Sequence, residues 1–306
     1  MTNMKHVLVV LGVYNGKVWL KEQIDSILNQ QGVRVSLIVG DDCSGDGSAD
    51  FIESQYLEVC EIVRFKEQSG GAGQNFLRLL KIIDTGKCDY VAFSDQDDIW
   101  SHNKLLSAVG KLESSSVAGY SCAVEAFWAD GSAKMLRQNP NVTDIDFLFE
   151  GAGQGCSFVL RSDFVAQVQK VLRNPRLNYS GVHYHDWFIY AISRALDRGW
   201  IFDSDSYLKY RQHGGNDTGA RGAWSGVKKR LQLIRSGWYV SQVRLIAAAI
   251  IEIGGPGVIP KDFAVILDRP DSIQRRLSFA CLLFKRGRRR LSDRAVLAIS
   301  AIFGWI

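Results

Sequence analysis

Segments with the pattern of buried strands alternate with amphipathic helical segments along the first hundred residues, and this alternation limits the fold more than any other feature. The strand-like runs are continuously apolar, as expected for strands covered on both faces. The segments between them repeat apolar residues at helical spacing. Such alternation predicts an α/β fold with a mostly parallel central sheet. The expected strands are 6–14, 35–42, 60–65 and 88–95, and the expected helices are 18–30, 48–56 and 73–84.

Polar residues follow three of the expected strands, at the point where each strand ends. Parallel α/β sheets bind ligands outside the carboxyl ends of their strands. One polar loop has an ordinary explanation, but three at the same sheet edge predict a ligand site. The residues are Asn15 after the first strand, Asp41 and Asp42 after the second, and Asp95, Asp97 and Asp98 after the fourth.

The glycine patterns disfavour two common nucleotide sites. "GVYNGK" after the first strand lacks the G-x-G-x-x-G of a dinucleotide site, and the G-x-x-x-x-G-K-[ST] phosphate loop is missing from the sequence. The glycine-rich segment 69–75 precedes a helix, so its N–H groups either meet a phosphate or belong to a flexible loop.

The acidic end of the fourth strand is the stronger signal. A Mg²⁺ or Mn²⁺ ion bridging Asp95, Asp97 and a diphosphate fits the preference of hard cations for carboxylate and phosphate oxygens. The alternative is a solvated turn in which Asp98 or Ser101 caps the next helix.

Five segments resemble glycosyltransferase family 2, of the GT-A fold: "VYNG", "DDCSGDGS", "FSDQDDIWSHNKL", "HDW" and "YRQHGGN". They occur in the family's order over roughly residues 5–218 and are most similar to its bacterial rhamnosyltransferase-like branch. The resemblance implies a GT-A catalytic domain over 1–218, with a nucleotide-binding half (1–100) and an acceptor half (101–218). Residues 219–306 would form a separate basic helical region.

The resemblance assigns the donor side as follows. Asp41 or Asp42 would hydrogen-bond the base and ribose region. "DQD" is similar to the family's D-x-D, so Asp97 would bind the metal with Asp95 as its partner. A glycine run replaces the usual Asn-x-Gly in the loop under the donor. The remaining residues implied to bind the nucleotide sugar are Val13, Tyr14, Asn15, Gly73, Asn75, Gln96, Arg211 and His213.

The acceptor side is assigned in the same way. Asp186 of "HDW" resembles the carboxylate that removes the acceptor proton, with a helix N-cap as the alternative. A zinc site of His183, His185 and Asp186 is disfavoured because no further ligand cluster supports it. Trp187, Gly153 and Gly155 are implied to line the acceptor pocket, although the two glycines also suit a tight turn.

Two of the residues implied to bind the nucleotide sugar have specific chemistry. Arg211 suits a diphosphate, and His213 suits either a metal or diphosphate contact or a loop-ordering hydrogen bond.

The end of the chain is strongly basic. Residues 219–306 hold 16 Lys and Arg against 5 Asp and Glu, whereas residues 1–218 hold 21 against 27. We expect helices over 224–252 and 273–303, and a basic amphipathic helix is typical of binding to an anionic membrane surface. The alternative is that these helices form a homodimer interface or cover the catalytic domain. Nucleic acid is not an expected partner, because interleaved aromatic residues are missing from this region.

The expected location is the cytoplasm, at the inner face of the cell membrane. No apolar stretch of the sequence reaches the roughly 18–20 residues that cross a bilayer. The N-terminus reads as a first strand rather than a signal peptide. The six cysteines are scattered, which indicates reduced thiols.

These observations predict an inverting, metal-dependent glycosyltransferase. It would move L-rhamnose from dTDP-rhamnose, or a hexose from a UDP-sugar, onto a saccharide hydroxyl of a lipid-linked cell-surface polysaccharide precursor. One alternative is a sugar-phosphate nucleotidyltransferase, although "GVYNGKVWLKEQ" is less rich in glycine and basic residues than its first loop requires. Another is a non-catalytic assembly protein associated with the membrane.

Overall fold

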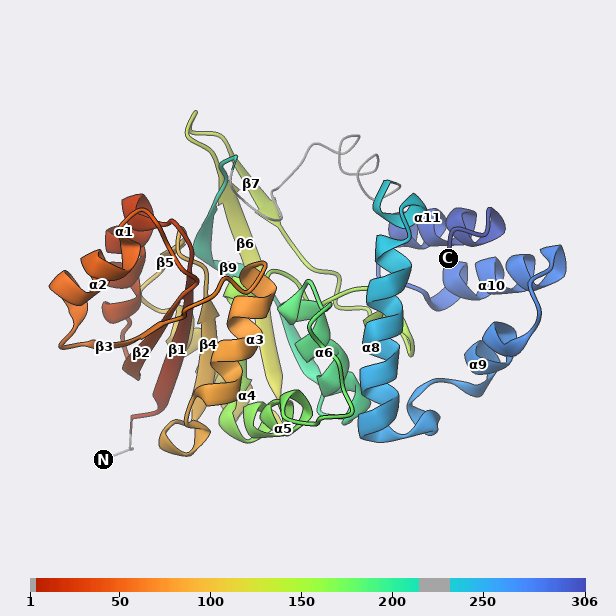
Figure 1. The fold of residues 1–306 in the computed structure, drawn as a ribbon, viewed down its shortest axis with the longest axis horizontal. Helices are drawn as coiled ribbons and strands as arrows, with labels where there is room; N and C mark the ends of the chain where they lie inside the picture. Colours follow the sequence, from red (N-terminus) through yellow and green to blue (C-terminus); the bar gives the residue numbers. More distant parts are fainter. Residues whose placement is uncertain (1–3, 215–231) are drawn as a thin grey trace.

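The computed structural model describes residues 4–214 and 232–306 and contains one curled sheet of nine strands (Figure 1). The strand order is β3-β2-β1-β4-β8-β6-β9-β5, with β7 paired to β6. The first four strands in this order are parallel, as is the β6–β9 pair, while β5, β7 and β8 join antiparallel. The strands are β1 (His6–Val13), β2 (Arg34–Asp41), β3 (Cys60–Arg64), β4 (Tyr90–Ser94), β5 (Ile99–Trp100), β6 (Gly119–Phe127), β7 (Ala133–Leu136), β8 (Val159–Arg161) and β9 (Trp200–Arg211).

Helices cover both faces of the sheet, so the first strands are apolar throughout. One core joins the sheet to α1, α2 and α4, and the other joins it to α3, α5, α6 and the C-terminal helices. The fold is the expected α/β class. The helices of the catalytic part are α1 (Lys17–Leu28), α2 (Ser48–Tyr56), α3 (Ala72–Ile82), α4 (Lys104–Glu113), α5 (Ser162–Leu172) and α6 (His185–Ala195).

The C-terminal region is helical, as predicted, but more divided than the sequence suggested. It contains α8 (Trp238–Gly254), α9 (Lys261–Asp268), α10 (Ile273–Arg286) and α11 (Leu291–Ile302). The expected helix over 273–303 is therefore two helices, because the chain turns at 287–290 and buries Arg289 against carboxylates of the catalytic part. Residues 224–231 of the other expected helix lie outside the described residues.

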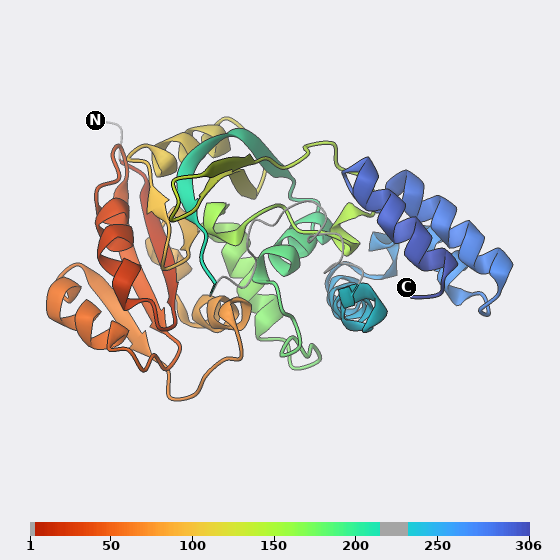
Figure 2. The same ribbon diagram turned by 90° about the horizontal axis from the view of Figure 1, so that it is seen from above.

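The C-terminal helices pack onto α6 and the core that it shares with the sheet. Helix α8 lies beside α6, and Ile246 and Ile250 of α8 belong to the same core as Phe188 and Ile192 of α6. Helices α9, α10 and α11 lie at the end of the molecule opposite α1 and α2 (Figures 1 and 2). Among the described residues, none of the helices combines the length and apolar character needed to cross a bilayer.

Candidate active site

The register of the parallel strands brings the predicted polar ends together. Val13 of β1 is paired with Asp41 of β2, and Leu11 of β1 is paired with Ser94 of β4. The loops that follow β1, β2 and β4 therefore leave the sheet side by side. This is the edge at which a parallel α/β sheet binds its ligand.

Side chains from these loops brace one another. The amide of Gln96 accepts from the backbone N–H of Tyr14 at 2.8 Å and donates to its carbonyl at 3.0 Å. Asn15, in the left-handed region at φ 50°, receives a bond from the Gly45 N–H at 2.8 Å. The Tyr14 ring is 47% exposed and free to stack on a base, whereas the Val13 side chain is buried in the core. Gln96 and Val13 therefore shape the site rather than offer side chains to a donor.

The two aspartates after β2 have different surroundings. Asp42 is saturated: Ser69 donates to it from both N–H and hydroxyl at 2.7 and 2.6 Å, and Arg78 pairs with it at 2.7 Å. Asp41 receives the Ser44 N–H at 3.1 Å on Oδ2, but its buried Oδ1 has no hydrogen-bond partner. A buried unpaired acceptor at a ligand-binding edge indicates a donor supplied from outside. Asp41 is thus the better candidate of the pair.

The predicted donor contacts at the start of α3 are not supported. Asn75 is buried, where its amide donates to the Gly40 carbonyl at 2.9 Å and accepts from Arg78. A Cβ at Gly73 would lie 2.0 Å from the His183 carbonyl oxygen, so glycine is needed there for the close approach of α3 to the start of α6. Both residues pack the interior instead of facing a nucleotide.

The D-x-D loop carries the polar groups that best fit a metal. Asp95 is half-buried, and Asp97 is hydrogen-bonded by His213, whose Nε2 lies 2.6 Å from Oδ2. The His213 ring stacks on Trp19 at 4.2 Å. Arg211 donates to the Asp97 carbonyl at 2.9 Å and pairs with Glu22. Carboxylate oxygens suit Mn²⁺ or Mg²⁺, so Asp95 and Asp97 are candidate ligands. Among the described residues, however, Asp95, Asp97 and His213 are not a group whose ligand atoms lie within 4.8 Å of one another.

Behind this loop lies a buried polar cluster that the sequence did not reveal. Asp98 is 1% exposed; its Oδ1 accepts from the Arg211 N–H at 3.3 Å, its Oδ2 is unpartnered, and the Cys156 thiol lies within 4.8 Å of its carboxylate. Burial first, and then the charges of Asp95 and Asp97, raise the pKa of Asp98 well above its usual range. Burial likewise raises the pKa of Cys156 and lowers that of Lys104 to about 8. Lys104, stacked 3.4 Å from the Trp100 ring, supplies the nearby positive charge.

This cluster contains an alternative set of metal ligands. Among the described residues, Asp95, Asp98 and Cys156 have ligand atoms within 4.8 Å of one another. A thiol with a raised pKa stays protonated and is a poor ligand for a hard cation. Asp95 and Asp97 therefore remain the predicted metal pair. Asp98 is not a helix cap, because α4 begins after Asn103.

Asp186 lies in the first turn of α6, on the acceptor side. The N-cap of this helix is Tyr184, so the alternative role of Asp186 as N-cap is wrong. Its Oδ1 accepts from the Trp187 N–H at 2.7 Å, and the side chain is half-buried. A negative charge at this position is stabilised by the helix dipole.

The neighbours of Asp186 have structural roles. The Trp187 indole is buried and donates to the Phe147 carbonyl at 2.8 Å, so its predicted contact with an acceptor is not supported. Burial lowers the pKa of His185 to about 3, and its ring stacks on Phe76 at 4.3 Å. The zinc set of His183, His185 and Asp186 is not among the metal-ligand groups that the described residues form.

The loop 151–156 connects Asp186 to the acidic strand end. A Cβ at Gly155 would lie 3.4 Å from the Asp186 Cβ and 2.4 Å from His185 Nε2, while the thiol of the next residue, Cys156, lies within 4.8 Å of the Asp98 carboxylate. Gly153 has φ 122°, a conformation that favours glycine. The glycines are thus explained by the turn and by close packing, and contact with an acceptor stays a prediction.

This arrangement, with carboxylates at the carboxyl edge of the parallel strands and Asp186 at the start of α6, is that of a glycosyltransferase of the GT-A fold. The chain belongs to the family described as Glycosyl transferase family 2, whose sequence model matches residues 8–184. The recognition made from the five motifs is confirmed. The chain is an enzyme of the transferase class, which sets aside a non-catalytic assembly protein.

Individual relatives agree with this assignment. The chain is 34% identical over 245 residues to a dTDP-rhamnosyl transferase, RfbG, of Shigella flexneri, covering 79% of this chain and 85% of that protein. It has the fold of S. aureus TarS, solved with UDP-GlcNAc (TM-score 0.57, 16% identity, 98% and 82% covered). It also has the fold of the Pyrobaculum calidifontis mannosyltransferase PcManGT, solved with GDP-Man and Mn²⁺ (TM-score 0.55, 15% identity, 99% and 87% covered).

Proposed function

We propose that the protein transfers L-rhamnose from dTDP-rhamnose, with inversion, to a hydroxyl group of a saccharide. The proposal rests mainly on the likeness to the Shigella flexneri dTDP-rhamnosyl transferase over most of both chains. The geometry that supports it is the placement of one accessible carboxylate, Asp186, across the 151–156 loop from the acidic end of β4. A hexose from a UDP-sugar is the second candidate donor.

Asp41 and Tyr14 would hold the base of the donor. The unpaired Oδ1 of Asp41 is an acceptor for an imide N–H, and the exposed Tyr14 ring is a stacking surface. Thymine and uracil carry this N–H at N3, and guanine carries a comparable N–H at N1, so the contact with Asp41 does not choose among these bases. The choice of a dTDP donor rests on the likeness to the dTDP-rhamnosyl transferase.

Asp186 would act as the general base. As the acceptor oxygen attacks the anomeric carbon, its hydroxyl proton passes to the Asp186 carboxylate and the bond to the diphosphate breaks. Asp95 and Asp97, with His213 beside them, would hold Mg²⁺ or Mn²⁺. When bound, this ion supplies positive charge to the departing diphosphate.

We further propose that the acceptor is a lipid-linked polysaccharide precursor and that the protein works at the cytoplasmic, inner face of the cell membrane. The basic C-terminal helices carry exposed apolar side chains, with Leu277 52% and Phe284 46% exposed. Their spacing of seven residues places them on one face of α10. Such a face with basic neighbours suits an anionic lipid surface.

A thermal-shift panel tests the donor. The protein is heated with dTDP-rhamnose, UDP-glucose or GDP-mannose, each with and without Mn²⁺. A ligand at 100 times its Kd stabilises the native state by about 2.7 kcal/mol. We expect the largest rise in Tm for dTDP-rhamnose with Mn²⁺. A larger rise for the UDP-sugar would move the assignment to the second donor, and a response to GDP-mannose alone would contradict both donors.

A further inference from the structure

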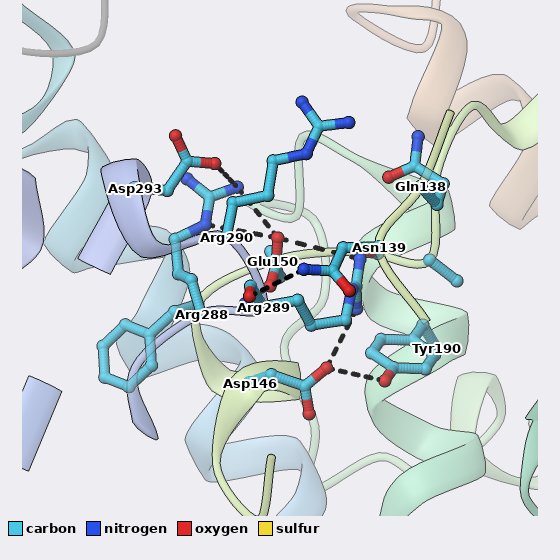
Figure 3. Close-up of polar contacts among 12 residues, drawn as sticks. Gln138, Asn139, Asp146, Glu150, Tyr190, Arg288, Arg289, Arg290 and Asp293 are labelled. Atoms are coloured by element: carbon cyan, nitrogen blue, oxygen red, sulfur yellow. Dashed lines mark hydrogen bonds and ion pairs between the residues drawn. The ribbon is translucent and has the colours of Figure 1, made fainter. Parts of the chain in front are cut away.

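The turn between α10 and α11 inserts two arginines into the acceptor half of the molecule (Figure 3). Arg289 is 3% exposed, and its Nη1 lies 2.9 Å from Asp146 Oδ2. Its Nη2 donates to the Gly151 carbonyl at 2.5 Å, and its backbone N–H donates to Glu150. Arg288 lies 3.3 Å from the other oxygen of Glu150. Two residues of the tail thus bind both ends of the segment 146–151.

Asp146 connects this turn to the helix that carries the proposed base. Its carboxylate is fully buried and accepts from Tyr190 at 2.8 Å and Arg194 at 2.6 Å, both on α6. Arg289 pairs with Oδ2 of the same carboxylate, the oxygen that also accepts from Tyr190, while Arg194 pairs with Oδ1. The tail, the segment 146–151 and α6 therefore share one buried charge network.

The segment held by Arg289 continues into the loop beside Asp186. A Cβ at Gly151 would lie 3.0 Å from the Trp187 Cα, so the loop touches the first turn of α6 where it begins. At the other end of the loop, Gly155 touches Asp186. The distance between this loop and the base is therefore fixed from two directions: by its contacts with α6 and by the fork of Arg289.

We propose that Arg289 is a positioning residue for the acceptor step, so that the C-terminal helices complete the acceptor site from outside the family-matched region. This inference rests on the proposed role of Asp186. The guanidinium is suited to the task because its planar fork reaches two acceptors, a carboxylate and a carbonyl, at fixed geometry. A lysine ammonium is a single point charge and satisfies one of them. In the described part of the chain, the hydrogen bonds that Arg289 donates go to residues 146–151 and none goes to β1, β2 or β4, where the donor side lies.

The test compares Arg289→Ala and Arg289→Lys with a matched control, Arg286→Ala. Arg286 belongs to the same basic run but pairs with Asp144 and Asp262, outside the loop 151–155. Five quantities are measured on the full chain: Tm, the Kd for dTDP with Mn²⁺ by calorimetry, kcat and KM for the acceptor, and amide hydrogen exchange over 146–156.

We expect Arg289→Ala to lower kcat/KM for the acceptor by roughly ten- to a hundredfold, since small displacements of a site cost factors of this size. The Kd for dTDP should hold within about twofold, and exchange over 146–156 should rise. Arg289→Lys should recover part of the acceptor kinetics and of the protection. Arg286→Ala should leave both near the wild-type values.

Equal losses of dTDP affinity and acceptor kinetics, or the same losses in Arg286→Ala, would overturn the proposal in favour of a general stabilising role. Unchanged exchange over 146–156 in both Arg289 variants would also overturn it. If Arg289→Ala does not fold, Arg289→Lys and Glu150→Gln carry the test. If the wild-type protein transfers no sugar, the proposed function fails while the exchange comparison still decides whether Arg289 holds the loop.

Discussion

The imidazole Nε2 of His213 lies 2.6 Å from Oδ2 of Asp97. This contact joins the segment after β9, the last strand, to the acidic end of β4. Trp19, from α1, stacks on the other side of the imidazole ring. A carboxylate held by a neighbour in this way has one preferred orientation, which a metal ligand requires. The contact also fits the loop-ordering hydrogen bond considered for His213 from the sequence.

The first prediction separates Asp97 from its neighbour Asp98. Asp97→Asn should weaken Mn²⁺-dependent binding of dTDP and abolish most transfer. Asp98→Asn should be much milder, because burial and two adjacent acids already favour the neutral form of Asp98, which an amide imitates. Calorimetry of dTDP with and without Mn²⁺ measures the difference. Equal loss in the two variants would show that the metal uses Asp98 as well.

The second prediction concerns the buried Lys104 and pH. Its pKa in the native protein is lowered to about 8 by burial, while an unfolded lysine titrates near about 10.4. Between these values the unfolded chain holds a proton that the native protein has lost, so the free energy of unfolding rises with pH. The stability is complete above the unfolded pKa and is lost as pH falls through the native one. The shift corresponds to on the order of 3 kcal/mol.

Lys104→Met should lack this rise. Urea unfolding of both proteins between pH 7 and pH 10 gives the comparison. We expect the wild-type protein to gain stability relative to the variant over this range. Parallel pH profiles would mean that Lys104 is solvated in the native state and that its apparent burial has no energetic effect.

The sheet edge could be predicted from the sequence because it depends on local patterns. Continuous apolar runs indicated β1, β2 and β4, and Asn15, Asp41 and Asp95 stood where those runs end. Parallel pairing of the strands then places the three ends together without further information. The carboxylate at the start of α6 was found through the resemblance of "HDW", since a single aspartate has no pattern of its own.

The support behind the site could not be predicted in this way. Cys156 comes close to Asp98 and Lys104 although it lies far from both in the sequence. In the sequence alone, Lys104 looks like an exposed residue on a helix surface. Gly73 looked like part of a phosphate loop. In the structure, the chain just before α6 passes so close to Gly73 that a side chain would not fit there. The run "KRGRRR" looked like a solvated basic face, but Arg288 and Arg289 are ion-paired within the protein. Charge alone does not distinguish these two uses.

The third prediction tests whether the exposed apolar face of α10, which carries Leu277 and Phe284, binds a membrane surface. Removing residues 285–306 is not a clean test, because it also removes the partners of Asp146 and Glu150. Replacing Leu277 and Phe284 by Gln should instead weaken binding to phosphatidylglycerol vesicles by roughly tenfold or more, because burial of one such side chain is worth about 1.5–3 kcal/mol. Sedimentation with vesicles at low and high salt measures this, since the basic contribution is screened by salt.

Leu57→Gln is the control for the vesicle experiment, because Leu57 is 64% exposed and follows α2 at the opposite end of the molecule. It should bind vesicles as the wild-type protein does. Unchanged vesicle binding by the double variant, together with loss of a dimer in analytical ultracentrifugation, would identify this face as a subunit interface instead.

The last prediction concerns Asp186. Asp186→Asn keeps the size of the side chain and its hydrogen bond to the Trp187 N–H but removes its basicity. Transfer at saturating acceptor should fall by roughly 10²–10⁴, the usual contribution of general base catalysis. The Kd for dTDP with Mn²⁺ should stay within a few-fold, because Asp186 lies on α6 whereas the proposed contacts to the donor base come from Tyr14 and Asp41. Tm should change little, since Tyr184 rather than Asp186 caps the helix.

The comparison of Asp186→Asn with Arg289→Lys adds a second criterion. Loss of the base lowers kcat itself, so saturating acceptor does not restore the rate. A displaced loop acts mainly on the acceptor KM. The two variants should therefore differ in which constant changes, although both act on the acceptor side. Near-normal turnover of Asp186→Asn would remove this carboxylate from the mechanism. The base would then have to be sought among the acids at the end of β4, where Asp95 is the accessible candidate because Asp97 and Asp98 are buried.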